Sequence, residues 1–309
     1  MNPFCELVGC RLPIQQAGMG RVANPALAAA VADAGGLGML ALSRHSPEAA
    51  ARDIADVHSR TPHPVGVTLL VEFLKEPLLR AVAERVRVVE LFWGWPDPAL
   101  VPPDNIVGWQ VGSADEAKAA VDAGCRFVVA QGVEAGGHVR GTTPLAELVP
   151  LVRGAVGVPV VAAGGIGTRA DVERALALGA DAVRVGTRFV AALESAAHPV
   201  YVDLLSAATG ADTRITETFG AGWPNAPHRV LSSSVEAALD GTADPIATAQ
   251  SADGTTIPFV RFGTAPPTAD MTGDIRAMAL YAGTSVGAVH GRVAAADIVA
   301  ELAEGLENA

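Results

Sequence analysis

The chain has 309 residues, half of them hydrophobic and 5% aromatic, with a formal net charge of −11 at pH 7. This length suits one elaborated domain with a large core, or two small domains. An acidic surface repels nucleic acid and anionic membranes, so neither is an expected partner.

The termini and cysteines indicate the compartment. The first residues lack the basic segment and apolar run of a signal peptide, and no uninterrupted apolar stretch reaches the roughly 18 residues of a membrane span. The three cysteines, Cys5, Cys10 and Cys125, show no metal-ligand or disulfide spacing. We therefore expect a cytoplasmic protein without a metal site.

Eight short apolar runs recur between residues 12 and 185. Each is followed by a glycine-rich or polar turn and then by an alanine-rich segment. Such runs are typical of buried parallel strands. They span residues 12–17, 37–41, 65–70, 86–92, 106–111, 127–131, 158–163 and 182–185.

The segments between these runs have the pattern of helices. Examples are residues 24–34, 47–59, 114–123, 143–153 and 169–178. Side chains that can accept a backbone N–H precede three of them, and glycines follow three of them, as expected at helix ends. The predicted caps are Asn24, Ser113 and Thr168, and the predicted stops are Gly35, Gly124 and Gly179.

Alternation of strands and helices predicts a parallel α/β sheet, either open and doubly wound or closed as a barrel. Eight similar units favour the (β/α)8 TIM barrel. A helix is predicted over residues 191–210. A helical pattern returns at residue 273, and a last helix is predicted over residues 294–306. The stretch 211–270 shows no buried strand pattern. We therefore expect a barrel from residues 1–205 and 271–309, with 206–270 as a small cap, or lid, over the active site.

Two glycine-rich turns follow the seventh and eighth runs. Gly164 and Gly165 come directly after the seventh, and Gly186 and Thr187 after the eighth. In barrels a phosphate commonly binds in these two loops, because glycines let successive backbone N–H groups approach an anion. The pair of turns predicts a phosphate site, with ordinary turns as the alternative.

The loop after the sixth run carries the candidate catalytic residue. Its sequence, VVAQGVEAGGHVRG, places Gln131, Glu134 and His138 at the end of a strand, with Gly136 and Gly137 directly before the histidine. Histidine is well suited to proton transfer near neutral pH, and loops at this face carry the chemistry of barrel enzymes. His138 is therefore predicted to be catalytic, with an ordinary surface-loop histidine as the alternative.

Other residues end strands at the same rim. Ala17, Gly18 and Met19 would let a planar ring contact the backbone, and Thr68 and Gln110, on the third and fifth runs, are expected to point to the same rim. Each alone could equally be structural. The sequence has no serine nucleophile elbow, metal-ligand cluster or dinucleotide G-x-G-x-x-G after a first strand.

Five ordered motifs together resemble the nitronate monooxygenase family, formerly the 2-nitropropane dioxygenases. Its near relative is the flavin-dependent enoyl-acyl carrier protein reductase. The motifs cover most of the chain. They are PIQQAGMG, NPALAAAVADAGGLGML, AQGVEAGGHVRG, PVVAAGGIGTRADVERALALGADAVRVGTRF and GDIRAMALYAGTSVG.

The resemblance implies noncovalent FMN in the barrel and matches His138 to the family's catalytic histidine. It assigns the FMN phosphate to the two glycine turns and the closing of the site to the last motif. The residues expected at the flavin are Ala17, Gly18, Met19, Thr68, Gln110, Gln131, Gly136, Gly137, Gly164, Gly165, Gly186, Thr187, Tyr281, Gly283 and Ser285.

Two positions depart from the family pattern. The third strand reads Gly66-Val67-Thr68 where relatives often have G-V-N, and Gln110 stands where some members have lysine. Both positions face the flavin in the family. FMN binding is still expected, but the substrate and the reaction type stay open.

The reaction that the resemblance implies is oxidation of an alkyl nitronate, or of the nitroalkane, by O2 to a carbonyl compound and nitrite. His138 would take the proton α to the nitro group. The alternatives are an NAD(P)H-dependent enoyl reductase and a non-catalytic barrel that binds a flavin or a phosphate. The expected oligomeric state is a monomer or a homodimer. Cap aromatics are expected to line an apolar pocket, namely Phe219, Trp223, Phe259 and Phe262.

Overall fold

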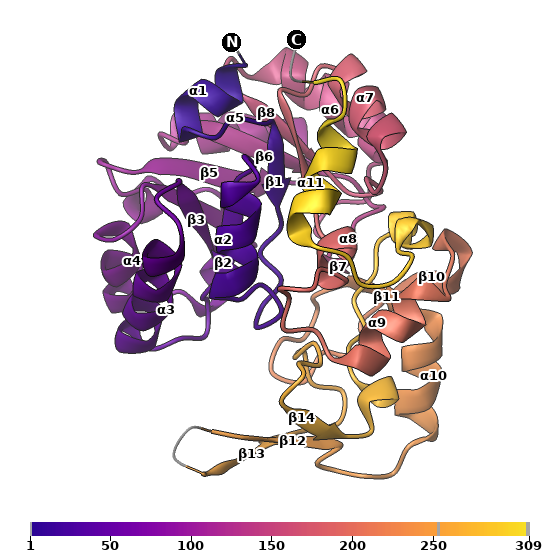
Figure 1. The fold of residues 1–309 in the computed structure, drawn as a ribbon. Coiled ribbons are helices and arrows are strands. Elements are labelled where there is room, and N and C mark those ends of the chain that lie inside the picture. Colours follow the sequence, from indigo (N-terminus) through magenta and orange to yellow (C-terminus); the bar gives the residue numbers. More distant parts are fainter. Residues whose placement is uncertain (1, 252–253, 307–309) are drawn as a thin grey trace.

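The computed structural model of the chain describes residues 2–251 and 254–306. Its centre is a parallel sheet in the order β1-β9-β8-β6-β5-β4-β3-β2 (Figure 1). Gln15 forms a parallel bridge with Leu37, just before β2, so the two edges of the sheet meet and the predicted TIM barrel is confirmed. The barrel strands are β1 (Ile14–Gln16), β2 (Gly38–Ala41), β3 (Val65–Leu70), β4 (Val88–Phe92), β5 (Ile106–Val111), β6 (Phe127–Gln131), β8 (Val160–Ala163) and β9 (Ala182–Val185).

Helices cover the outside of the barrel, and their apolar faces join the strands in the largest core cluster. A further helix, α1 (Pro3–Val8), closes the amino-terminal end, where Phe4 packs edge-on against Phe127 with ring centroids 5.6 Å apart. No helix in the described part of the chain is long and apolar enough to cross a membrane. The outer helices are α2 (Pro25–Asp33), α3 (Pro47–Arg60), α4 (Glu76–Ala83), α5 (Ala114–Asp122), α6 (Leu145–Ala155), α7 (Arg169–Ala177) and α11 (Ala295–Ala303).

The capping signals read from the sequence are confirmed. The three predicted N-cap side chains each accept a hydrogen bond from the backbone N–H three residues further on. The three predicted glycine stops have φ of 99° to 100°, the left-handed conformation that ends a helix. Short-range chemistry is therefore sufficient to define these helix ends.

Residues between α8 (Thr187–Val190) and α11 form most of a second, smaller lobe, seen below the barrel in Figure 1. This lobe contains two short antiparallel sheets, β10-β11-β7 and β13-β12-β14. One of its strands, β7 (Gly137–His138), belongs to the loop that follows β6. The other elements are α9 (Pro199–Ser206), β10 (Thr213–Thr216), β11 (His228–Leu231), α10 (Ser232–Asp240), β12 (Ala247–Gln250), β13 (Thr256–Phe259) and β14 (Met271–Gly273).

The expectation that residues 211–270 contain no strand is wrong. Four strands, β10 to β13, lie in this stretch. Each has four residues, and two of them pair with strands outside the stretch, since β11 pairs with β7 and β12 with β14. Strands this short show no alternation in the sequence, because distant partners determine them.

Two predicted helices are also wrong in extent. In residues 191–210 the helix α9 begins only at Pro199, because the His198 side chain caps it by accepting a hydrogen bond from the backbone N–H of Val200. From residue 273 the chain forms two short 3-10 helices, η4 (Ile275–Ala277) and η5 (Thr284–Ala288), with a non-helical segment between them. There Tyr281 forms an antiparallel bridge with Val230, and this tertiary pairing overrides the helical pattern.

Candidate active site

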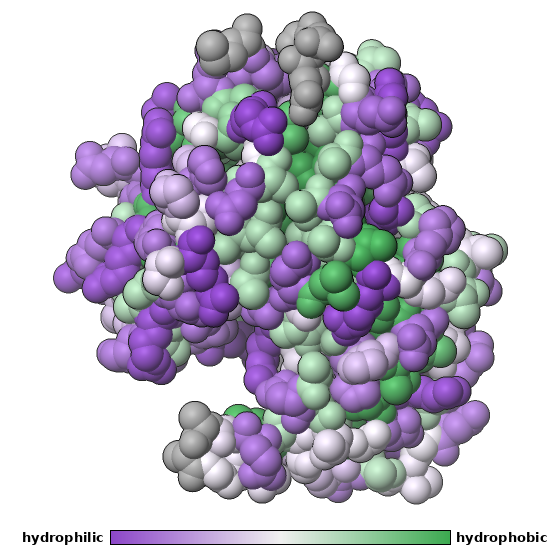
Figure 2. Space-filling view, in the orientation of Figure 1, coloured by the Kyte–Doolittle hydropathy of each residue, from purple (hydrophilic) through white to green (hydrophobic). Residues whose placement is uncertain are grey.

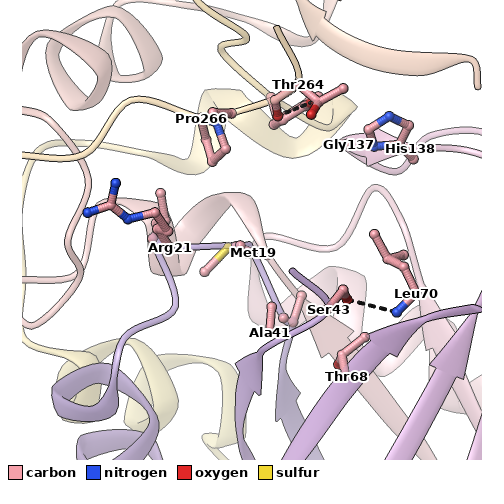
Figure 3. A pocket seen from close by; sticks show the side chains of 18 of the residues that line it. Met19, Arg21, Ala41, Ser43, Thr68, Leu70, Gly137, His138, Thr264 and Pro266 are labelled. Carbon is pink, nitrogen blue, oxygen red and sulfur yellow. Dashed lines mark hydrogen bonds between the residues drawn. The ribbon is translucent and has the colours of Figure 1, made fainter. Parts of the chain in front are cut away.

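A cavity of about 820 Å³ lies between the carboxyl ends of the barrel strands and the smaller lobe. Every residue that the sequence assigned to catalysis or to the flavin lines this cavity. Figure 3 shows Met19, Ala41 and Thr68 on the barrel side, with His138 and Thr264 opposite them. The molecular face in Figure 2 is hollowed between the barrel and the β12–β13 hairpin, whose residues 257–260 also line the cavity.

The turn after β8 has the geometry of an anion-binding loop. Gly164 and Gly165 have φ of 113° and 68°, and a Cβ at Gly164 would lie 2.9 Å from the backbone N of Ala135. The N–H groups of Gly165 and Ile166 find no acceptor in the described residues. Free amides in a turn that only glycine can form suit a phosphate group.

Three distant segments meet beside this turn. The Thr187 hydroxyl accepts a hydrogen bond from the Gly283 backbone N–H at 3.0 Å. A Cβ at Gly136 would lie only 2.5 Å from the Gly283 nitrogen, so the backbones touch. A Cβ added at Gly137, where φ is 79°, would have no atom within 4 Å. Bare backbone facing open space allows a planar ring to approach, so the cavity fits both a phosphate and a flat ring system.

The His138 imidazole belongs to an aromatic cluster. It stacks on Trp223 with centroids 3.9 Å apart and an interplanar angle of 25°, and it lies 5.1 Å from the His228 ring, which comes from the paired strand β11. Its Nε2 is buried and has no hydrogen-bond partner in the described chain. An orphaned buried nitrogen at a cavity wall is available to a ligand.

Burial, followed by the nearby His228 and the charge of Arg44, lowers the pKa of His138 to about 3. The imidazole is therefore neutral at pH 7 and can accept a proton. It does not supply a resting positive charge to the cavity. An uncharged imidazole can act on a substrate as a proton acceptor but not as a resting electrostatic anchor.

Trp93, which follows β4, also belongs to this cluster and was not among the predicted site residues. Its φ of 63° is rare for a residue other than glycine. Its ring packs edge-on against Trp223 and His138, with centroids 5.0 and 5.9 Å away. Strained backbone of this kind clusters at functional sites, and its local signal was the aromatic, glycine-containing sequence FWGW directly after a strand.

The floor of the cavity contains a buried ion pair that the sequence analysis also missed. Arg184 on β9 pairs with Glu90 on β4, and the two residues are 7% and 0% exposed. Gln15 and Thr68 donate hydrogen bonds to the Glu90 carboxylate at 3.1 and 3.3 Å, and Arg184 donates to Gln110. The sequence signal for this ion pair was one charged residue in each of two apolar runs, Glu90 in 86–92 and Arg184 in 182–185.

Some expectations about the pocket wall are wrong. Trp223 and Phe259 line the cavity, but Phe219 and Phe262 do not. Phe219 is fully buried in the core of the smaller lobe, and Phe262 packs beneath the Arg261 guanidinium. Glu134 lies outside the cavity lining, because its carboxylate accepts the Leu145 N–H at the start of α6.

A Gly164→Ala variant is expected to weaken binding at this turn by about tenfold or more, measured with FMN, the phosphate-bearing ring that the sequence predicts, as the probe. Alanine at a φ of 113° costs about 1–3 kcal/mol of backbone strain, and its Cβ would push the turn away from Ala135. Quenching of FMN fluorescence on titration with protein measures the affinity. The control is Gly157→Ala, whose Cβ meets no atom within 4 Å; equal affinities in both variants would contradict the assignment of this turn.

Comparisons with known proteins agree with this geometry. The family model for nitronate monooxygenase matches residues 2–90 and 78–305. A nitronate monooxygenase of Pseudomonas aeruginosa is 33% identical over 278 residues, covering 72% of this chain and 79% of the relative. The structure of FabK from Thermotoga maritima superposes with a TM-score of 0.80 and 28% identity, covering 100% of this chain and 98% of that one.

A nitroalkane oxidase from Streptomyces ansochromogenes gives a TM-score of 0.78 with 28% identity, over 97% of this chain and 98% of the other. The family match extends over nearly the whole chain and includes both the barrel and the smaller lobe. The chain therefore belongs to the nitronate monooxygenase family, whose members are oxidoreductases.

Proposed function

We propose that this protein is an FMN-dependent nitronate monooxygenase that oxidises alkyl nitronates with O2 to a carbonyl compound and nitrite. One observation carries the proposal. A neutral imidazole with an unpartnered, buried Nε2 faces the same cavity as the free amides of the Gly164–Gly165 turn. A phosphate-bearing ring and a proton acceptor would thus share one site.

The residues around the cavity have distinct roles in this proposal. The amides of Gly165 and Ile166, with Gly186 and Thr187, would hold the FMN phosphate, and Gly136 and Gly137 would lie against its ring. Bound FMN would supply the redox centre that accepts electrons from the substrate. His138 Nε2 would take the α proton when the neutral nitroalkane enters.

The smaller lobe would limit access of water to the reaction. Trp223 and Tyr281 line the cavity from this lobe, and the Tyr281 hydroxyl donates to the Thr264 carbonyl at 2.9 Å. An apolar, aromatic wall strengthens electrostatic interactions within the site. We propose residues 206–270 as the lid over the barrel; the smaller lobe also includes β14 and the segment that carries Tyr281, which follow this stretch.

The test uses the purified protein. Its absorbance spectrum is expected to show bound oxidised flavin. The cofactor released when the protein is denatured should be FMN. In air it should release nitrite from ethyl nitronate at a rate proportional to enzyme concentration. A colourless protein that takes up no FMN, or a flavoprotein that forms no nitrite, would contradict the proposal.

The second candidate is an NAD(P)H-dependent enoyl reductase, favoured by the similarity to FabK over the whole chain. Anaerobic addition of NADH or NADPH separates the two functions. Rapid bleaching of the flavin would support the reductase. An unchanged spectrum, together with nitrite formation in air, would support the monooxygenase.

A further inference from the structure

Arg44 differs from the other arginines of the cavity. Three arginines line it, and two of these are paired, Arg21 with Asp270 at 2.7 Å and Arg184 with Glu90. Within residues 2–251 and 254–306, Arg44 has no carboxylate partner. In a protein with a net charge of −11, a cation left without a partner at a cavity wall is free to bind an anion.

An aromatic ring holds the Arg44 guanidinium in place. Its Cζ lies over the ring of Phe73, 3.8 Å from the centroid, in a cation–π contact. Phe73 packs edge-on against Trp223 at 5.1 Å, and Trp223 stacks on His138. The ring covers one side of the guanidinium, and the planar fork of N–H donors is the part of the group that binds an oxyanion.

The loop that carries Arg44 is anchored on both sides. The Leu70 backbone N–H donates to the Ser43 hydroxyl at 2.8 Å, a bond drawn in Figure 3, and this ties the loop to the end of β3. On the other side His45 Nε2 lies 3.3 Å from an Asp53 carboxylate oxygen on α3. Because Phe73 follows β3 in the 3-10 turn η1 (Val71–Phe73), these anchors keep Arg44 and Phe73 together.

The charge of Arg44 reaches the reacting region. Burial is the main influence on the pKa of both His138 and Tyr281, lowering the first and raising the second. Arg44 lowers the pKa of each. A positive charge that acts on both walls of the cavity also acts on a substrate placed between them.

We propose that Arg44 binds the negatively charged oxygens of the substrate, so that the site selects the nitronate anion over the neutral nitroalkane. This inference rests on the proposed function and adds its specificity-determining residue. A nitronate carries its charge on two coplanar oxygens, which match the planar fork of a guanidinium. His138 would take a proton from the neutral nitroalkane, whereas Arg44 would bind the nitronate anion.

The experiment uses nitrate, a planar oxyanion that is not oxidised, as a probe for binding to the purified protein. Quenching of tryptophan fluorescence reports the Kd, since Trp223 lies beside both Phe73 and His138. Arg44→Met is expected to raise the Kd for nitrate about tenfold, the effect of losing one charge-assisted hydrogen bond. Arg44→Lys should retain part of the affinity, and Phe73→Leu should weaken it without changing the charge.

Arg52→Met is the matched control, because Arg52 lies exposed on α3, outside the cavity lining, and its loss changes the net charge equally. A rise in Kd no larger in Arg44→Met than in this control would overturn the proposal.

The turnover test is the KM for two substrates with one carbon skeleton. In Arg44→Met the KM for ethyl nitronate should rise about tenfold, clearly more than the KM for nitroethane, whose nitro group carries no net charge. Equal changes for both substrates would overturn the proposal. If no variant releases nitrite but nitrate binding still depends on Arg44, the assigned reaction fails and the anion site stands.

Discussion

Replacing His138 with glutamine is expected to lower kcat for nitroethane by about 10²–10⁴-fold, the usual contribution of a general base. The orphaned Nε2 is the proton acceptor that the cavity offers at this position, and it is neutral at pH 7. Ethyl nitronate has already lost its α proton, so its kcat should fall far less. Steady-state nitrite release from both substrates measures the difference.

The control for an intact site is the amount of FMN that the His138→Gln variant binds, which should equal that of the unsubstituted protein. Equal losses of kcat for both substrates would mean that His138 does not act as a base. The pH profile adds a second measurement. Because the pKa of His138 lies near 3 rather than 6.5, nitroethane turnover should show no change attributable to this imidazole between pH 5 and 8.

The same lowered pKa affects stability. The unfolded chain binds a proton at His138 below about pH 6.5, whereas the folded protein does not until about pH 3. The free energy of unfolding should therefore decrease as the pH falls through this window. His138→Gln should weaken that dependence.

The largest effect on stability is expected for Glu90→Gln. This change keeps the shape of the side chain but leaves the Arg184 charge unpaired in the barrel interior, where Glu90 is 0% and Arg184 7% exposed. Breaking a buried pair from one side costs about 3–5 kcal/mol. Urea unfolding followed by circular dichroism measures the loss.

Two further variants test the cause. The double variant Glu90→Gln with Arg184→Gln should recover most of the lost stability, because no charge is then buried without a partner. Glu84→Gln removes the carboxylate of the exposed pair with Arg85 and should cost less than about 1 kcal/mol. A small loss in Glu90→Gln would show that solvent reaches Arg184 and that the floor of the cavity is wet.

Local chemistry explains why much of the barrel could be predicted. Runs of β-branched and small apolar residues are long enough to identify the strands, and three caps and three glycine stops define helix ends within a few residues of themselves. Prediction fails in the smaller lobe. There, strands of four residues form by pairing with one another and with β7 and β14, and α9 begins only at Pro199, after the His198 cap.

The sequence by itself determined that eight βα units follow one another and that glycine turns and a histidine follow particular strands. Strand ends of a parallel barrel meet at one rim, so these motifs could be assigned to one site without coordinates. Only the tertiary structure decided which charges face each other there. Arg184 meets Glu90, and the Arg44 guanidinium lies over the Phe73 ring without a carboxylate partner among the described residues. Such pairings depend on barrel register and loop position rather than on spacing along the chain.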